Sequence, residues 1–477
     1  MRDIVLVRLR GYTNYITPPL GIGYLFKALE GINEVNLVFI DEHRDKMKEE
    51  ELLARIKMTR PIVIGFQVFS VDYAKFCRRI PKIRKICPEA KIIAGGPHIT
   101  GLPEQALIDN PDLDFVVKGE GEEAIRLLVL SLLKGSLDSR IKDIPNLVYR
   151  TSNGIVRNRS EFVDVNRYGA PAWKIIEPHK YPPIQQGTFH KSNRVVPILT
   201  SRGCPYPCTF CAGHLITGKT IRRRSINSVV DEIEFLQANY GFGEIIIEDE
   251  NFTFYKDHIL GLSNEIQRRN IKCYFSFPNG IRSDRLDEEI VHHLKQIRTY
   301  MVTLGIESGS EKTLRAMKKN WDLQALKKKI NLLKANGISI LGSFILGFSN
   351  ETKEDIKKTI NFAIESGVDT AYFGNYIPLP GSEDFNRMIN NGEIKLEEIN
   401  WNAYTSYLGR IPYHPPDISE KELLEAIRWA TIRFYCRPKI ILNLIKRMTR
   451  PIFLKSLIFR IINLFKRYDN QHESKSY

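Results

Sequence analysis

The sequence predicts an α/β protein in which two parallel-sheet domains precede a helical C-terminal region. Short apolar, β-branched runs alternate with helical patterns in two separate series, and glycine-rich turns follow several of these runs. Connections of this kind are right-handed crossovers, which require parallel strands. The chain of 477 residues is long enough for two or three domains with their own cores.

Residues 1–135 predict a flavodoxin-like domain of Rossmann type. The expected strands are Ile4–Arg8, Val35–Ile40, Ile62–Val68, Lys91–Ala94 and Phe115–Lys118, with helices at Leu20–Leu29, Glu49–Met58 and Tyr73–Cys87. The turns 95-GGPH-98 and 119-GEGEE-123 follow strands, so they lie at the carboxyl edge of the sheet, where such folds bind ligands. Residues 136–190 are proline-rich with little periodicity, and we expect a linker with small elements there.

Residues 191–400 predict a partial (β/α)6 barrel of TIM type. The expected strands are Val195–Thr200, Glu244–Glu248, Lys272–Phe277, Tyr300–Gly305, Ser339–Ile345 and Thr370–Ile377. Six strand–helix units are fewer than a closed barrel needs, so we expect a barrel open on one side. Residues 401–477 are predicted to form a helical C-terminal region.

Three of the seven cysteines lie together in 200-TSRGCPYPCTFCAGH-214, directly after the first barrel strand. The other four are scattered, so clustered thiols point to metal or redox chemistry rather than to a disulfide scaffold. One interpretation is a zinc site in which His214 joins Cys204, Cys208 and Cys211 as a ligand. An iron–sulfur cubane normally takes four thiolates, and with only three one iron stays open to a reactant.

The C-x3-C-x2-C spacing, with Phe210 before the last cysteine, resembles the signature of the radical S-adenosylmethionine (SAM) enzymes. The resemblance implies that Cys204, Cys208 and Cys211 hold a [4Fe-4S] cluster. It also implies that SAM chelates the open iron and is cleaved to a 5′-deoxyadenosyl radical. An external electron donor such as flavodoxin or ferredoxin is implied as well. The alternatives are zinc and an ordinary electron-transfer cluster.

Other barrel segments resemble the same family. Asp249 in 245-IIIEDENFTF-254, Glu307 and Ser308 in 305-GIESGS-310, and Gly347 in 342-GSFILGF-348 match positions near SAM. For Asp249 the alternative is a solvated strand end, and for Gly347 it is a role in packing or a turn. Glu307 directly follows an apolar strand, where an unpaired carboxylate would be costly, so a ligand contact is favoured.

The first domain resembles the cobalamin-binding domain of one large radical SAM class. The resemblance lies in 18-PPLGIGYL-25, 95-GGPH-98 and 119-GEGEE-123. It implies that cobalamin is held by Pro19, Leu20, Gly21, the segment from Gln67 to Ser70, Gly95, Gly96, Gly119, Glu120 and Gly121. The alternative is a flavodoxin-like domain that has lost its cofactor.

The histidines of this domain are a departure from the family pattern. Many cobalamin domains place D-x-H-x-x-G after the first strand, but 9-LRGYTNYITPP-19 holds no histidine. Asp41 and His43 imitate part of that motif after the second strand, and we expect His43 to be a surface residue. His98 is expected either to touch the ligand tail or to cap a helix.

The net charge of +15 is concentrated at the C-terminus, where residues 437–467 hold no acidic residue. At helical spacing this segment has basic and apolar faces, which is typical of helices at membrane interfaces, and a pair of helices covering the barrel is the alternative. No nucleic-acid partner is expected, because related methylthiotransferases carry further cysteines and an RNA-binding barrel. The N-terminus lacks a signal-peptide layout. We expect a cytoplasmic protein with peripheral contact to the inner face of the membrane.

The resembled class includes anaerobic magnesium-protoporphyrin ester cyclases and hopanoid methylases. It implies hydrogen abstraction from an unactivated carbon of a lipid-like or tetrapyrrole-like substrate, followed by methyl transfer from methylcobalamin or by oxidative cyclisation. Two alternatives remain open. One is a cobalamin-independent radical SAM cyclase or rearrangement enzyme, and the other is a non-catalytic metal-binding protein associated with a membrane or RNA.

Overall fold

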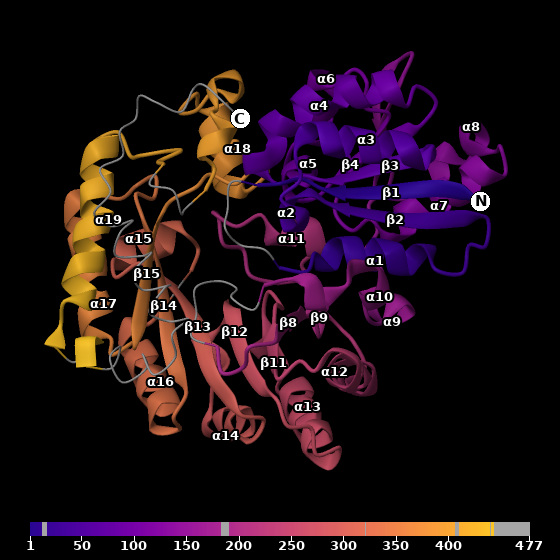
Figure 1. The fold of residues 1–477 in the computed structure, drawn as a ribbon. Coiled ribbons are helices and arrows are strands. Elements are labelled where there is room, and N and C mark those ends of the chain that lie inside the picture. Colours follow the sequence, from indigo (N-terminus) through magenta and orange to yellow (C-terminus); the bar gives the residue numbers. More distant parts are fainter. Residues whose placement is uncertain (12–16, 183–189, 320, 406–409, 439, 443–477) are drawn as a thin grey trace.

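The computed structural model describes residues 1–477 except 12–16, 183–189, 320, 406–409, 439 and 443–477. Its described part contains two large, mainly parallel sheets, each covered by helices (Figure 1). The predicted α/β class, with a flavodoxin-like first domain and a partial barrel after it, is confirmed. The predicted basic amphipathic helices between residues 439 and 467 lie almost entirely outside the described residues.

The first sheet has the strand order β2-β1-β3-β4-β5-β6-β7. Its strands are β1 (Arg2–Arg8), β2 (Val35–Asp41), β3 (Pro61–Gln67), β4 (Lys91–Gly95), β5 (Phe115–Val117), β6 (Leu147–Thr151) and β7 (Gly154–Arg157). The first five strands are parallel, and their apolar runs are buried by helices on both faces of the sheet. Their carboxyl ends therefore share one edge.

Helices cover this sheet on two sides. The helices are α1 (Leu20–Leu29), α2 (Glu42–Asp45), α3 (Glu49–Thr59), α4 (Tyr73–Ile86), α5 (Pro97–Gly101), α6 (Pro103–Asp109), α7 (Glu122–Leu133) and α8 (Leu137–Arg140). The apolar residues of α3, α4 and α6 pack on one face, and those of α1 and α7 pack on the other. This arrangement is the doubly wound layering that the sequence predicts.

The hairpin β6–β7 extends the first sheet and was not predicted. It pairs antiparallel with β5, at Phe115↔Tyr149, within the segment that the sequence predicts to be a linker. Its strands are short and joined by a tight turn, so they give little periodic signal. The remainder of residues 136–190 contains small elements as expected, with α9 at Val165–Tyr168 and α10 at Trp173–Ile176.

The second sheet has the order β15-β14-β13-β12-β11-β8, with every neighbouring pair parallel. Its strands are β8 (Val195–Ile198), β11 (Glu244–Ile247), β12 (Tyr274–Ile281), β13 (Thr299–Glu307), β14 (Ser339–Leu346) and β15 (Thr370–Asn375). Because β15 and β8 stand at opposite ends and do not pair, the sheet is an open, six-stranded partial barrel. All six strands match the predicted positions.

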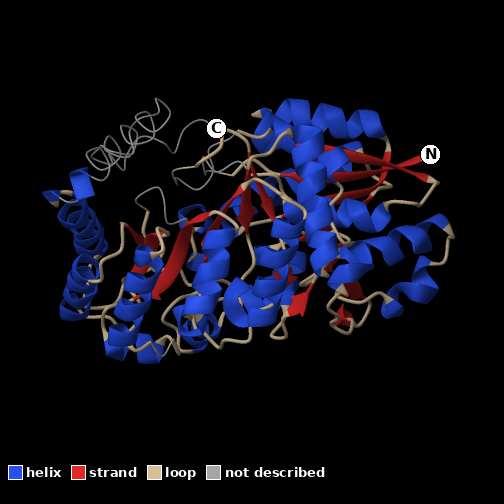
Figure 2. Ribbon diagram, turned by 90° about the horizontal axis from the view of Figure 1, so that it is seen from below, coloured by secondary structure: helices blue, strands red, loops and turns tan. Residues whose placement is uncertain are grey.

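Helices surround this sheet on its outer side (Figure 2). They are α12 (Ile226–Tyr240), α13 (Lys256–Arg268), α14 (Glu288–Gln296), α16 (Leu323–Ala335) and α17 (Lys353–Glu365), whereas α15 (Glu311–Ala316) and α18 (Glu383–Asn390) lie toward the carboxyl ends of the strands (Figure 1). The last described helix, α19 (Glu420–Tyr435), packs on the edge strand β15. Reciprocal capping boxes, Thr352 with Asp355 and Ser419 with Glu422, start α17 and α19.

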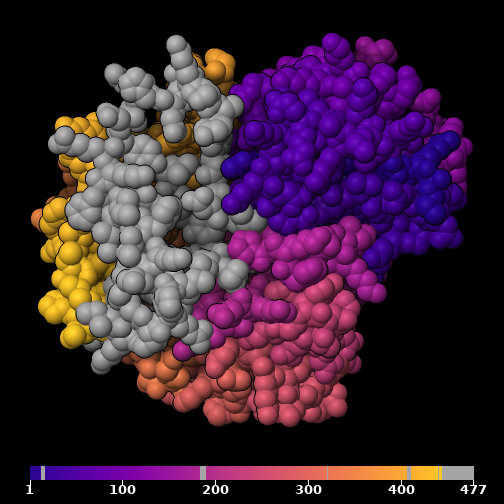
Figure 3. All heavy atoms as spheres, viewed as in Figure 1, coloured from indigo at the N-terminus to yellow at the C-terminus, as the bar shows by residue number. Residues whose placement is uncertain are grey.

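The two sheets share one apolar core. Leu6 and Phe26 of the first domain join Trp173, Ile176 and the barrel core in a single buried cluster. The space-filling view shows the first domain seated directly against the chain near residue 200 (Figure 3). A shared core of this kind restricts relative domain motion. Within the described residues, no helix has both the length and the apolar character needed to cross a bilayer.

Candidate functional site

The cysteine loop, residues 203–221, begins and ends at one short two-stranded stem. The stem consists of β9 (Ser201–Arg202) and β10 (Arg222–Arg223), which pair antiparallel beyond the carboxyl end of β8. The Cys204 N–H donates to the Gly218 carbonyl at 3.1 Å. Gly203 has a φ of 107°, and a Cβ there would collide with the Thr220 carbonyl, so only glycine fits directly before the first cysteine. The backbone thus fixes where the thiols lie.

The three thiols are half-buried and form no disulfide. Burial raises the pKa of each thiol, that of Cys211 to about 11. Arg282 opposes this rise at Cys204 and Cys208, and Lys319 opposes it at Cys208 and Cys211. Metal binding must displace the protons, and the two cations favour the thiolates that result. Three sulfurs from one loop fit a cubane that keeps one iron free of protein ligands.

The arrangement of side chains does not form a site for a single ion. Across the part of the chain that the structure describes, no three His, Cys, Asp or Glu side chains meet at one point suitable for a metal. His214 lies directly after the cysteines, in α11 (Gly213–Thr217). A cubane does not need such convergence, because each thiolate binds a different iron.

Glu307 and Lys319 form a buried ion pair beside the cysteine loop. The Lys319 Nζ lies 2.5 Å from Glu307 Oε1, and each side chain is 10% exposed. Lys319 also lies 6.0 Å from the centre of the Phe210 ring, within the loop. Glu307 has a φ of 65°, a conformation that is rare for residues with a side chain and that concentrates at functional sites. A carboxylate next to an ammonium complements the opposite charges of an α-amino acid.

Ser308 and Asp249, both predicted to lie near SAM, have side chains that bind other protein groups. The Ser308 Oγ lies 2.9 Å from the Thr359 Oγ1 of α17. Asp249 accepts hydrogen bonds from the Thr200 N–H at 2.7 Å, the Thr200 hydroxyl at 2.6 Å and the Ser201 hydroxyl at 2.7 Å. Burial raises the pKa of Asp249. Asp249 is not the solvated strand end that was the alternative, and it holds the backbone that enters the cysteine loop.

Gly347 lies where β14 gives way to α17 and packs against the C-terminal helix. It has a φ of 83°, and a Cβ there would lie 2.5 Å from Leu423 of α19. Its N–H donates to Glu351 Oε2 at 2.6 Å. These contacts favour the alternative reading, in which Gly347 serves a turn and packing.

The loops predicted to hold cobalamin gather at the carboxyl edge of the first sheet. Pro19, Leu20 and Gly21 begin α1, and Gly21 is exposed next to Gln67, the last residue of β3. Gly95 ends β4, and its carbonyl accepts from the Val68 N–H at 2.9 Å. A Cβ on Gly96, whose φ is 101°, would lie 2.9 Å from the Val68 backbone. The Gly119 N–H donates to the Thr100 hydroxyl at 3.0 Å. This edge of tight backbone turns fits the periphery of a large planar ligand.

His98 does not cap a helix, because the N-cap of α5 is Gly96. Its ring is 1% exposed, and its Nδ1 lies 3.1 Å from the Ser70 hydroxyl. Burial lowers the pKa of His98 to about 3, so the ring is neutral. Tyr73 and Trp401 pack on it at centroid distances of 4.0 and 4.6 Å. His98 and Ser70 therefore belong to a buried aromatic cluster at this edge.

His43, predicted to be a surface residue, is only 5% exposed. Asp41 caps α2 by accepting hydrogen bonds from the His43 and Arg44 N–H groups, which turns the segment inward. The Tyr181 hydroxyl also donates to Asp41, at 2.5 Å. The part of 41-DEHRDK-46 that resembles a cobalt-binding motif thus has a structural role.

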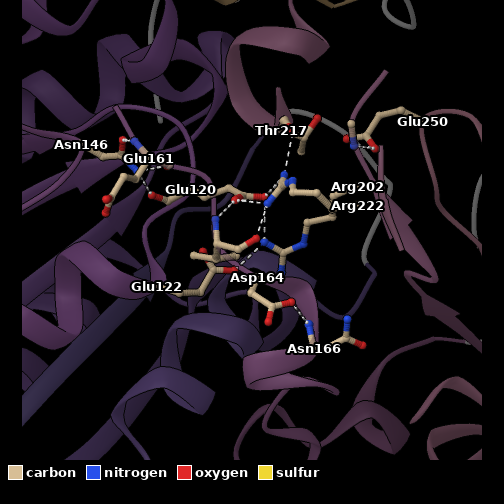
Figure 4. Close-up of polar contacts among 12 residues, drawn as sticks. Glu120, Glu122, Asn146, Glu161, Asp164, Asn166, Arg202, Thr217, Arg222 and Glu250 are labelled. Atoms are coloured by element: carbon tan, nitrogen blue, oxygen red, sulfur yellow. Dashed lines mark hydrogen bonds and ion pairs between the residues drawn. The ribbon is translucent and has the colours of Figure 1, made fainter. Parts of the chain in front are cut away.

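The side chain of Glu120, a residue predicted to contact cobalamin, binds arginines at the base of the cysteine loop (Figure 4). It accepts a hydrogen bond from Arg202 at 3.0 Å and two from Arg222 at 2.8 Å. The local sequence 119-GEGEE-123 gives no sign of these partners, which are about 80 to 100 residues further along the chain.

Several residues of the site were not predicted from the sequence. These residues are Arg202, Arg222, Arg282, Lys319 and Trp401. Arg202 stands two positions before Cys204, so its place in the motif was a signal that could have been used. The other four are brought to the site by tertiary contacts alone.

The chain matches two protein-family models. The model described as Radical SAM superfamily matches residues 198–363, and the model described as B12 binding domain matches residues 9–129. An uncharacterised methyltransferase of Pyrococcus horikoshii is 30% identical over 435 residues, which cover 89% of each chain. The anaerobic magnesium-protoporphyrin IX monomethyl ester cyclase of Rubrivivax gelatinosus is 26% identical over 88% of this chain and 74% of its own.

The fold is also similar to solved structures. The radical S-adenosylmethionine methyltransferase TsrM from Kitasatospora setae, solved with cobalamin and a [4Fe-4S] cluster bound, superposes with a TM-score of 0.70. The alignment covers 92% of this chain and 91% of that one at 18% identity. At this identity the likeness concerns the fold, and it extends over both sheets described above.

Proposed function

Because the chain belongs to the radical SAM superfamily and carries a B12-binding domain ahead of its barrel, we propose that it methylates an unactivated carbon of a small molecule. It is an enzyme, and its cofactors are a [4Fe-4S] cluster, SAM and cobalamin. One observation carries the proposal. The three-cysteine loop at the mouth of the barrel lies against the glycine-rich edge of the first domain, with Gly119 facing the Leu215 and Ile216 carbonyls.

When bound, the cluster and SAM supply a 5′-deoxyadenosyl radical and cobalamin supplies a methyl group. Cys204, Cys208 and Cys211 would hold the cluster. The Glu307–Lys319 pair would receive the α-amino acid part of SAM, with Glu307 binding the amino group and Lys319 the carboxylate. Each ion of the protein pair would then keep an opposite charge beside it, so no buried charge would be left alone.

We infer that contacts between the two domains help to keep water from one side of the site. Gly101 of α5 meets Pro380, beyond the end of β15, so closely that a Cβ would collide with the Pro380 carbonyl. Gly381 lies against Leu215 of α11 and against Gly101. These backbone contacts close the two domains over one side of the barrel mouth. Exclusion of water protects reactive intermediates from side reactions.

The names of the relatives suggest two classes of reaction and one class of substrate. The name of one relative specifies methyl transfer, and that of another specifies cyclisation of a magnesium-protoporphyrin ester. We place methylation first, with oxidative cyclisation as a second candidate that rests on the cyclase relative. The substrate would be lipid-like or tetrapyrrole-like. A reduced flavodoxin or ferredoxin would donate the electron, and the basic C-terminal segment would bring the enzyme to the membrane surface.

The decisive experiment is anaerobic reconstitution with iron, sulfide and a corrinoid, followed by SAM and a reductant. We expect about four irons per chain, bound corrinoid and formation of 5′-deoxyadenosine. Cys208→Ala should lose both iron and 5′-deoxyadenosine, whereas Cys436→Ser, at an exposed cysteine, should retain them. Bound zinc without turnover would contradict the proposal, and turnover without corrinoid would favour the cobalamin-independent alternative.

The reaction itself can be read from the product. Mass spectrometry of lipid and pigment extracts, from cells with and without the protein, should show a compound heavier by one methylene group. Loss of hydrogen with a new ring would instead identify oxidative cyclisation.

A further inference from the structure

The stem of the cysteine loop places two arginines next to each other. Arg202 and Arg222 are direct partners in the antiparallel pair β9–β10, so their side chains start from neighbouring positions. Arg202 is 7% exposed. Two guanidinium groups on neighbouring positions, one buried and one half-buried, repel each other unless an anion lies between them. The stem therefore needs a partner with negative charge, and it contains none itself.

The first domain supplies that anion. Glu120 accepts hydrogen bonds from Arg202 at 3.0 Å and from both terminal nitrogens of Arg222 at 2.8 Å. Glu122 accepts a further bond from Arg202 at 2.6 Å. Figure 4 shows the two carboxylates pointing from the first domain toward the two guanidinium groups. Burial opposes the charge on Arg202, but Glu122, Tyr24 and Glu120 together raise its pKa.

Further contacts tie the same groups in place. The Arg202 guanidinium lies 4.3 Å from the centre of the Tyr24 ring of α1. Arg222 donates to the Thr217 carbonyl at 2.6 Å, and Glu120 accepts from the Val163 N–H at 2.8 Å. The arrangement therefore joins α1, the turn after β5 and both ends of the cysteine loop.

The turn that carries Glu120 is the same turn that the sequence predicts to hold cobalamin. A Cβ on Gly119 would lie 3.4 and 3.5 Å from the carbonyls of Ile216 and Leu215, which belong to the cysteine loop. Gly119 and the residue after it thus have different tasks: Gly119 allows the two loops to approach closely, and Glu120 binds the stem. The turn predicted to hold cobalamin and the cysteine loop therefore contact each other directly.

We propose that Glu120, Glu122, Arg202 and Arg222 form a clamp that fixes the position of the bound corrinoid relative to the iron–sulfur cluster. The four are positioning residues, since they act through the two loops that they join. This inference rests on the proposed function and adds to it how the two cofactors are kept in register. Loosening the clamp should leave each cofactor bound while the distance between them becomes variable.

Pulsed electron paramagnetic resonance tests the clamp in the holoenzyme. Cob(II)alamin and the reduced cluster each carry unpaired spin, so their dipolar coupling reports the distance between them. The wild type should give one narrow distance distribution. Glu120→Gln and Arg222→Gln should lose that narrow distribution, and Arg222→Lys, which keeps the charge, should partly restore it. The control is Arg223→Gln, since Arg223 pairs with Asp257 inside the barrel domain and should leave the distribution narrow.

The possible results separate the two proposals. Iron and corrinoid are counted in every sample before the measurement. Glutamine variants that hold both cofactors and keep the narrow distribution would overturn the clamp. If Glu120→Gln does not fold, Arg222→Gln decides, because loss of a purely structural pair would lower the thermal midpoint of this variant without broadening the distance distribution. A wild type without cluster or corrinoid would overturn the proposed function instead.

Discussion

Replacing Glu351 with glutamine is expected to remove a pH-dependent loss of stability from the barrel. Glu351 is 2% exposed and accepts hydrogen bonds from the Gly347 and Phe348 N–H groups at 2.6 and 3.3 Å. Burial raises the pKa of Glu351 to about 8, although these two bonds oppose the rise. A glutamine side-chain carbonyl can accept the same two bonds without ever carrying charge.

The raised pKa of Glu351 determines how the stability of the folded protein changes with pH. Between pH 4.5 and about 8, the carboxyl ionises in the unfolded chain but stays neutral in the folded one. Stability from Glu351 is therefore complete below the unfolded pKa and is lost as pH rises through the folded pKa. The shift corresponds to about 5 kcal/mol across that range. No such loss is expected in Glu351→Gln.

The measurement is the thermal midpoint of both proteins by calorimetry over this pH range. The midpoint of Glu351→Gln should rise above that of the wild type as pH increases, and the gap should level off above about pH 8. Two curves that stay parallel from acid to alkaline pH would refute the reasoning. Asp355 provides a control of opposite sign, because Thr352 and Ser310 outweigh its burial and lower its pKa to about 2. Asp355→Asn should therefore cost stability mainly above pH 3.8.

Three further predictions concern the site. Asp249→Ala leaves the Thr200 and Ser201 groups without their acceptor, so we expect the free energy of unfolding to fall by ~2–6 kcal/mol and the iron bound per chain to decrease. Asp249→Asn should be closer to the wild type, and an equal iron content in the two variants would contradict this prediction. Lys319→Met should weaken SAM binding by about tenfold or more in equilibrium dialysis, while Lys319→Arg should retain most of it, and unchanged affinity in Lys319→Met would exclude the pairing. Gly347→Ala should lower the thermal midpoint by the equivalent of ~1–3 kcal/mol, and adding Leu423→Ala should recover little, because the backbone strain remains.

Much of the fold could be predicted from the sequence because several strands, such as β1 and β11, are buried without interruption over their central residues. Runs such as 3-DIVLVR-8 and 244-EIII-247 are then continuous and apolar, and a single sequence displays them clearly. The hairpin β6–β7 could not be predicted in this way, since its strands lie at a sheet end and are too short to show a period. The order of the six barrel strands followed from their order along the chain.

The candidate site was predictable where one loop carries the chemistry. Cys204, Cys208 and Cys211 are identified by their spacing, and the structure adds the stem and the cations around them. The partners of Glu120 and Gly347 could not be predicted from sequence, because each lies far away along the chain. Arg222 determines the role of Glu120, and Leu423 determines the role of Gly347.

The helix α19 lies on the exposed edge of the barrel sheet. The Tyr435 hydroxyl there accepts from the Ala371 N–H at 3.2 Å and donates to the Ala371 carbonyl at 2.8 Å, so it occupies backbone groups that a further strand would pair with. An uncovered edge strand is a template for self-association. A chain cut before Ser419 should consequently form intermolecular sheet and precipitate. A chain cut after Tyr435 should remain monomeric in solution, because α19 still covers the backbone groups of the edge strand β15.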